Sequence, residues 1–203
     1  SLKYKDGDKP FIEFPSANAH ELLVFTDKSQ VYKCKVSQFE DTKSAQLGSY
    51  LPTDLEMDAD ESVTWVLDPK DYKADALFVF ENGRVARVAL AGYVTKTNRK
   101  RLKNAIYGGA KLLYAQVLKV DRDLALVSND NRLMNFNTSL LKTKTTTSTQ
   151  GIQAFTAKKN RLVVSVGVAE DYLGAGVSAE RFCAQSLPSS GAPMKEEDMP
   201  SLF

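Results

Sequence analysis

The stretch ALFVFENGRVARV, residues 76–88, decides the fold class of this chain. Five apolar residues come first, a polar turn with Asn82-Gly83 follows, and a second, roughly alternating run comes last. Asn and Gly both accept the positive φ angles that the two-residue turns of β-hairpins require. The stretch therefore predicts a β-hairpin that turns at Asn82-Gly83.

The same strand–turn–strand pattern occurs at residues 22–36 and 124–136. The matching positions Val31 and Val85 are 54 residues apart, and Val85 and Leu133 are 48 residues apart. Repeats of this length are typical of propeller blades with three or four strands. We therefore expect the three hairpins to take equivalent places in successive blades.

Further strand-like runs complete these repeats. One run precedes each hairpin, at residues 11–14, 63–67 and 113–120, and a fourth unit is expected to begin at Gly151. Few segments have the periodicity of a helix. The sequence predicts an all-β, propeller-like domain of about four blades, whose ring is closed, incomplete or open.

The domain is expected to span residues 1–172. Residues 173–203 are rich in Gly, Ser, Ala and Pro and contain Glu196, Glu197 and Asp198 near their end. Such a composition has little apolar surface to bury. We expect residues 173–203 to form an extended acidic tail with weak packing.

Charge is separated along the chain. Residues 1–83 contain 9 Lys and Arg against 16 Asp and Glu, which gives a net charge of −7. Residues 84–161 contain 16 against 3, which gives +13, and residues 162–203 contain 2 against 6, which gives −4. A basic segment of this kind indicates a polyanionic partner.

Duplex DNA is the partner that the basic segment favours, because a long basic surface gains affinity by releasing the counterions of DNA. The sequence shows no recognition helix, so we expect contacts with phosphates rather than with bases. The candidate DNA contacts are Arg84, Arg87, Lys96, Arg99, Lys100, Arg101, Lys103, Arg132, Lys142, Lys144, Lys158, Lys159 and Arg161. The aromatic residues of the strands are expected in the core instead.

Other kinds of site have little support. His20 is the only histidine, and Cys34 and Cys183 belong to no Cys-x-x-Cys pair, so we expect no metal site and two free thiols. The acidic residues 54–61 lack the spacing of a calcium loop and are expected to form a solvated connection. No nucleotide-binding motif, membrane segment or signal peptide is visible. Because the first residue is Ser rather than Met, a piece of a longer protein is expected.

Three motifs resemble those of one known family. They are Phe25-Thr26-Asp27-Lys28 with Val31-Tyr32, the run from Phe80 to Val88, and Thr149-Gln150-Gly151-Ile152-Gln153. All three are similar to blade motifs of the β-pinwheel domain that ends the A subunit of bacterial type IIA topoisomerases, DNA gyrase and topoisomerase IV. The resemblance covers roughly residues 9–170, and residues 181–188 resemble the tails of some A subunits.

The resemblance implies a β-pinwheel whose rim binds and bends or wraps duplex DNA without sequence preference. The parent enzyme, an isomerase, would then present this DNA for ATP-dependent strand passage, with a separate ATPase B subunit. Gyrase carries a box of the form Gln-Arg-Arg-Gly-Gly-Lys-Gly, which this chain lacks, so a topoisomerase IV-like role is favoured.

The fragment itself is expected to have no catalytic residue and no cofactor, because the family's catalytic Tyr lies in another domain. ATP and Mg would bind other domains or subunits of the parent enzyme. The expected partners are duplex DNA, the B subunit, and the rest of the A subunit. We expect a monomeric fragment, a bacterial cytoplasmic location in association with the nucleoid, and no contact with membranes.

Two alternatives stay open. One is a propeller-like scaffold that binds proteins and no nucleic acid. The other is a propeller enzyme, which is disfavoured because no acid pair, nucleophile with a base, or metal cluster stands out. Salt-dependent binding to duplex DNA of random sequence separates the first alternative from a DNA-binding domain.

Overall fold

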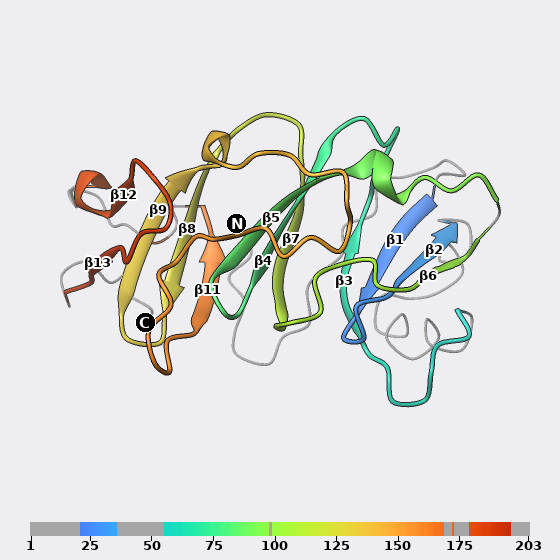
Figure 1. The fold of residues 1–203 in the computed structure, drawn as a ribbon, viewed down its shortest axis with the longest axis horizontal. Helices are drawn as coiled ribbons and strands as arrows, with labels where there is room; N and C mark the ends of the chain where they lie inside the picture. The colour runs from blue at the N-terminus through green and yellow to red at the C-terminus, as the bar shows by residue number, and fades with distance from the viewer. Residues whose placement is uncertain (1–20, 36–54, 98, 169–171, 173–178, 196–203) are drawn as a thin grey trace.

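The computed structural model describes residues 21–35, 55–97, 99–168, 172 and 179–195. In these residues the regular structure is β-strand, apart from three short 3-10 helices. The helices are η2 (Leu90–Tyr93), η3 (Thr138–Leu140) and η5 (Ala179–Phe182). The predicted all-β fold with open, blade-like sheets is confirmed, and Figure 1 shows the sheets side by side along the long axis.

Each of the three sheets in the described residues is built around one predicted hairpin. The first sheet has the order β3-β1-β2-β6 and contains β1 (Glu21–Thr26), β2 (Val31–Lys35), β3 (Val63–Leu67) and β6 (Arg101–Leu102). The second has the order β10-β5-β4-β7 and contains β4 (Asp75–Phe80), β5 (Arg84–Ala89), β7 (Leu112–Leu118) and β10 (Ile152–Gln153). The third has the order β11-β8-β9-β12 and contains β8 (Asp123–Ser128), β9 (Arg132–Asn137), β11 (Val163–Gly167) and β12 (Cys183–Ala184); β13 (Ala192–Pro193) also pairs with β9.

Successive sheets are linked by an exchange of strands. After β5 the chain crosses to the first sheet, where β6 pairs with β2, and it then returns as β7 beside β4. After β9 it crosses to the second sheet, where β10 pairs with β5, and it then returns as β11 beside β8. The expectation that a fourth unit begins at Gly151 is therefore wrong, because β10 and β11 complete the second and third sheets. The run expected at residues 11–14 lies outside the described residues.

The three hairpin turns share one geometry, which differs in detail from the prediction. Gly83 has a φ of 83°, and the equivalent residues Ser29 and Asn131 have φ values of 58° and 55°. Asn82 does not have a positive φ, and the last two residues that pair before the turn are Val79 and Val85. The loop is therefore longer than the predicted two-residue turn, and one left-handed residue ends it, as in hairpins with a bulge.

The core explains why residues 76–80 are continuously apolar. Phe78 and Phe80 pack towards the first sheet, whereas Leu77 and Val79 pack towards the third sheet. Successive side chains of a strand point to opposite faces, so β4 is buried on both sides. The rings of Phe25 and Phe78 meet edge to face with centroids 5.3 Å apart. The prediction that the aromatic residues of the hairpins form the core is confirmed.

Residues 179–195 pack more closely than the sequence predicts. Phe182 is 1% exposed and packs against Val127 and Leu133 of the third sheet. β12 pairs with β9 in parallel and β13 pairs with it antiparallel. Weak packing is therefore a wrong expectation for residues 179–195, while the boundary at 172/173 stays a prediction. The acidic residues 196–198 lie outside the described residues.

Candidate nucleic-acid interface

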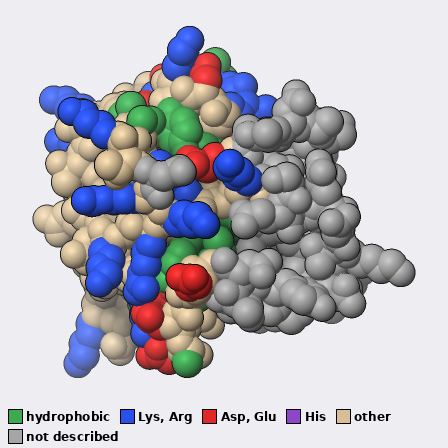
Figure 2. Space-filling model, turned by 90° about the vertical axis from the view of Figure 1, so that its right-hand side faces the viewer, with side chains coloured by type: hydrophobic (Ala, Val, Ile, Leu, Met, Phe, Trp, Pro, Cys, Tyr) green, Lys and Arg blue, Asp and Glu red, His purple; other side chains and the backbone are tan. Residues whose placement is uncertain are grey.

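Two crossing segments carry six of the exposed basic side chains. The first crossing segment, residues 94–103, leads from η2 to the edge of the first sheet; the second, residues 141–151, leads from η3 to the edge of the second sheet. The exposed basic residues on them are Lys96, Arg99, Lys100, Lys103, Lys142 and Lys144. Figure 2 shows Lys and Arg side chains spread over the described part of the face beside the first sheet, with acidic side chains among them.

Backbone hydrogen bonds hold both crossing segments against the hairpins. The amide of Lys33 donates to the carbonyl of Lys100 over 2.7 Å. In the second sheet Ala89 donates to the carbonyl of Lys144 over 2.9 Å, and Lys144 donates to Arg87 over 2.8 Å. These bonds fix the backbone of the crossing segments, so the Cα atoms of their exposed lysines and arginines have defined positions at the edge of each sheet.

The two crossing segments repeat one arrangement. Lys96 and Lys144 each stand six residues after the first residue of their 3-10 helix, Leu90 and Thr138. Both lysines are exposed, and neither forms an ion pair with a described residue. Both crossing segments therefore carry an exposed lysine at the same distance along the chain from their 3-10 helix.

Three more candidates lie outside these segments. Lys158 and Lys159 are exposed in the turn between β10 and β11, and Arg84 is half-buried at the start of β5. Like the lysines of the crossing segments, these three make no ion pair within the described part of the chain. Eight exposed candidates are thus free to contact an anion: Lys96, Arg99, Lys100, Lys103, Lys142, Lys144, Lys158 and Lys159.

Arg87 is occupied by contacts inside the protein. Its Nε donates to Asp75 and its Nη1 donates to Asp121, both over 2.7 Å. The same Nη1 also reaches the carbonyl of Thr138 over 3.1 Å. Asp75 belongs to the second sheet and Asp121 to the chain that enters the third, so Arg87 links two successive units.

Arg101 is also held internally, by the acidic segment that the sequence predicts to be solvated. Its Nη2 donates to Asp58 over 3.0 Å and its Nε donates to Gln30 over 2.6 Å. In the same segment Glu61 is buried and accepts hydrogen bonds from Tyr32, over 2.5 Å, and from Gln30. The described residues 55–61 are therefore a packed structural element rather than a solvated connection.

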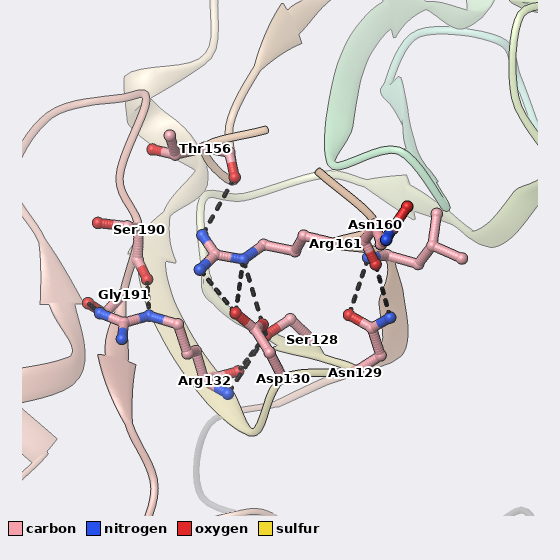
Figure 3. A network of polar contacts seen from close by, with 10 residues as sticks. Ser128, Asn129, Asp130, Arg132, Thr156, Asn160, Arg161, Ser190 and Gly191 are labelled. Atoms are coloured by element: carbon pink, nitrogen blue, oxygen red, sulfur yellow. Dashed lines mark hydrogen bonds and ion pairs between the residues drawn. The ribbon is translucent and has the colours of Figure 1, made fainter. Parts of the chain in front are cut away.

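Arg161 and Arg132 lie in one polar network (Figure 3). The Arg161 guanidinium is 4% exposed, donates to Asp130 over 2.7 Å and to the carbonyl of Thr156 over 3.2 Å, and lies over the ring of Phe155. Arg132 donates to the carbonyls of Ser190 and Gly191. These contacts join the hairpin turn at residues 128–132 to residues 156–161 and 190–191. They leave Arg161 little access to a ligand.

Replacing Arg161 with Ala is expected to lower the free energy of unfolding by about 2 kcal/mol. Removing one partner of a buried ion pair costs most when the other charge stays buried, but Asp130 is half-exposed and regains water. Denaturant unfolding measures the loss. Because Arg161 is buried, DNA affinity of the folded variant should stay within about twofold of wild type; a tenfold loss would show that Arg161 contacts DNA.

Stability should also change with pH through Asp130. The hydrogen bonds from Arg161, and then from Ser128, lower the pKa of Asp130 to about 2, below the value of about 3.9 for an unfolded chain. A lowered pKa stabilises the fold above pH 4, and this contribution is lost as the pH falls from about 4 to about 2. Since Asp130 is half-exposed, we expect less than about 1 kcal/mol.

The measurement for Asp130 compares wild type with Asp130→Asn in denaturant titrations between pH 2 and pH 7. The difference in unfolding free energy should be constant above about pH 5 and should vanish near pH 2. A difference that is independent of pH would mean that the charge of the Asp130 carboxylate does not contribute to the free energy of unfolding.

A hollow beside the first crossing segment contains a basic residue that the charge pattern of the sequence does not single out. The hollow measures about 430 Å³ and is lined by Glu21, Lys33, Lys96 and Arg99, among others. The Lys33 side chain is 8% exposed, lies 3.6 Å from Glu21 and donates to Thr95 over 3.1 Å. Because Lys33 is paired with Glu21, Lys96 and Arg99 are the cations of this hollow that stay available to an anion. Lys33 occupies the same repeat position as Arg87, 54 residues earlier, which is the signal that could have found it.

Other expectations from the sequence concern metal ligands, thiols and membrane segments. Within the described residues no group of three His, Cys, Asp or Glu side chains lies close enough to hold a metal ion. Cys34 and Cys183 are free thiols, as predicted. No helix among these residues has the length and apolar character needed to cross a membrane.

The fold defines a structural class, that of the β-pinwheel domains. The C-terminal domain of DNA topoisomerase IV superposes with a TM-score of 0.60 at 23% identity over 72% of this chain and 46% of that one. The C-terminal domain of DNA gyrase A gives a TM-score of 0.56 at 16% identity over 90% and 64%, and that of E. coli ParC gives 0.52 at 16% over 74% and 57%. These likenesses confirm the predicted fold.

The sequence points to a particular relative within this class. The A subunit of DNA topoisomerase 4 from Staphylococcus aureus strain MSSA476 is 25% identical over 172 residues, which cover 82% of this chain, and the same protein from strain MRSA252 gives the same values. The chain spans about a fifth of the length of these relatives, 21%. No family model matches it. Fold and sequence together support the predicted relationship to the C-terminal domain of type IIA topoisomerase A subunits.

Proposed function

We propose that this chain binds duplex DNA without sequence preference and bends or wraps it, as the C-terminal domain of a topoisomerase A subunit. The observation that carries the proposal is the set of eight exposed candidates that form no ion pair with a described residue, six of which lie on the two crossing segments. The relationship to the A subunit of topoisomerase 4 supplies the biological setting. The candidate contacts are these exposed residues.

Phosphates are the groups that these side chains suit. Lysine and arginine on irregular segments reach the sugar–phosphate backbone, which carries no sequence information directly. The described residues contain no helix longer than four residues that could enter the major groove. Binding should therefore depend on the charge of DNA rather than on its sequence.

The repeat explains how a rim of this kind would bend DNA. Lys96 lies on the segment that leads to the first sheet and Lys144 on the segment that leads to the second, so one duplex that contacts both would follow the edges of two successive sheets. A curved path costs elastic energy, which further phosphate contacts offset. A series of blades can thus hold DNA in a bend without reading any base.

The role of the whole protein is part of this proposal. We place the domain in an A subunit that works with an ATPase B subunit, and it presents the bent DNA for ATP-dependent strand passage. In this assignment ATP and Mg act elsewhere in the enzyme, the fragment is a monomer, and the location is the bacterial cytoplasm beside the nucleoid. The lack of the gyrase box favours a topoisomerase IV-like reaction.

The test is the salt dependence of binding. If all eight exposed residues contact phosphates, affinity for duplex DNA of random sequence should fall by about four orders of magnitude between 50 and 200 mM salt. Fluorescence anisotropy with two unrelated duplexes of equal length measures both the slope and the tolerance of sequence. Binding that is absent at 50 mM salt, or that ignores salt, would contradict the proposal and favour a protein-binding scaffold.

A further inference from the structure

The edge of the second sheet shows how an incoming strand docks in this fold. Gly151, with a φ of 62°, leads into β10, and Ile152 pairs with Val85. Beyond the strand, the amide of Ala154 donates to the carbonyl of Gly83 over 3.0 Å. Before the strand, the amide of Gly151 donates to the hydroxyl of Thr149 over 3.2 Å.

The edge of the third sheet receives residues 189–194 by the same set of contacts. Gly191, with a φ of 57°, leads into β13, and Ala192 pairs with Leu133, the residue equivalent to Val85. Met194 donates to the carbonyl of Asn131 over 2.8 Å, and Gly191 donates to the hydroxyl of Ser189 over 3.1 Å. A hydroxyl residue, a left-handed glycine and a short strand thus recur in the same order at both edges.

We infer that residues 189–194 are a terminating strand, which occupies the place of a following unit's incoming strand and closes the third sheet. While this strand is bound, the outer edge of β9 is closed to a further blade and to a second copy of the chain. An uncovered strand edge is a template for pairing with another chain, and proteins commonly cover such edges.

Contacts from two directions hold the terminating strand. Arg132 donates to the carbonyls of Ser190 and Gly191 over 2.7 and 2.9 Å (Figure 3). On the other side, Ser189 donates to Ala154 over 2.9 Å and accepts from Thr156 over 2.8 Å. The segment therefore also touches the chain that follows β10. Arg132 acts here as a positioning residue for the terminating strand.

Gly191 is the residue on which the docking depends. A Cβ atom added to Gly191 would lie 2.4 Å from the carbonyl oxygen of Leu133, a distance at which the backbone must move. A β-branched residue also resists the left-handed conformation. The backbone conformation alone corresponds to about a tenfold shift towards the released strand.

The first measurement is hydrogen exchange on the unaltered full chain. The amides of Ser189 and Met194, which donate to carbonyls in the structure, should exchange at least about tenfold more slowly than in an unstructured peptide. Exchange at the rate of an unstructured peptide would overturn the inference, and this result requires no variant to fold.

The second measurement compares Gly191→Val with Ser186→Val in the full chain. Ser186 is exposed and lies three residues before the terminating strand, so Ser186→Val adds the same side chain at a position where it can point to solvent. Gly191→Val should speed the exchange of the Ser189 and Met194 amides by about tenfold or more, while the amides between β8 and β9 stay protected. It should also make the chain self-associate with rising concentration in sedimentation, because the part of the β9 edge that β12 does not cover, at Arg132 and Leu133, is then uncovered. Two variants that exchange alike and remain equally monomeric would overturn the inference.

Discussion

Replacing Lys96, Arg99, Lys100 and Lys103 together with Ala is expected to weaken binding to duplex DNA by about two to three orders of magnitude near 150 mM salt. Each lost phosphate contact removes counterion release, so the slope of log K against log salt should also decrease by about 0.9 per contact. Titrations of a labelled duplex at several salt concentrations measure both quantities. The loss should be equal for unrelated sequences.

The matched control removes four exposed lysines that lie off the crossing segments: Lys70, Lys73, Lys111 and Lys119. It changes the net charge by the same amount, so a long-range effect of charge would lower the affinity equally in both variants. We expect the control to lose less than about tenfold. Equal losses would mean that net charge, and not the crossing segments, determines binding. Thermal unfolding of both variants shows whether the fold is kept.

The hairpins are predictable because their information is local. Residues 76–88 contain two strands and a turn within 13 positions. The continuous apolar run of β4 indicates that this strand is buried on both faces. Only the turn differs: Gly83 takes a positive φ and Asn82 does not, so the loop is longer than the Asn-Gly pair suggests. That distinction depends on the twist of the finished hairpin.

The exchanged strands could not be predicted, because they contain almost no pattern. β6 and β10 are two residues long each, and period-two alternation needs more residues than that to be visible. Their place is fixed by partners far away in the sequence, such as Val31 for Leu102 and Val85 for Ile152. From the sequence alone, the strand after Gly151 therefore resembles the start of a unit of its own.

Which basic residues are free is equally hidden in the sequence. Arg161 and Asp130 are 31 residues apart, and Arg101 and Asp58 are 43 apart, yet each pair is in contact. Charge counting treats every cation of residues 84–161 alike, because it cannot see which acid each one meets. The structure separates the set into internal links, such as Arg87, and the exposed residues that we propose as contacts.

Replacing Gly151 with Val is expected to lower the free energy of unfolding by about 3–5 kcal/mol, among the larger effects of a single substitution. Gly151 has a φ of 62°, a conformation that a β-branched residue rarely adopts. A Cβ atom at this position would lie 2.0 Å from the carbonyl oxygen of Val85. Since no flexible side chain can yield there, β10 has to leave the edge of β5. Urea unfolding measures the loss.

The consequence should extend from stability to DNA binding. Lys142 and Lys144 lie on the second crossing segment, which ends at β10. When β10 leaves the edge of β5, this segment is no longer held at that end, and both lysines lose their fixed positions. Phosphate contacts then require ordering of the segment, and affinity should fall by about tenfold although no charge is removed. Gln150→Val is the control, because Gln150 is the exposed neighbour of Gly151 and its change should stay within about 0.5 kcal/mol. If Gly151→Val unfolds at the same urea concentration as Gln150→Val, strand exchange between the second and third units does not stabilise the domain.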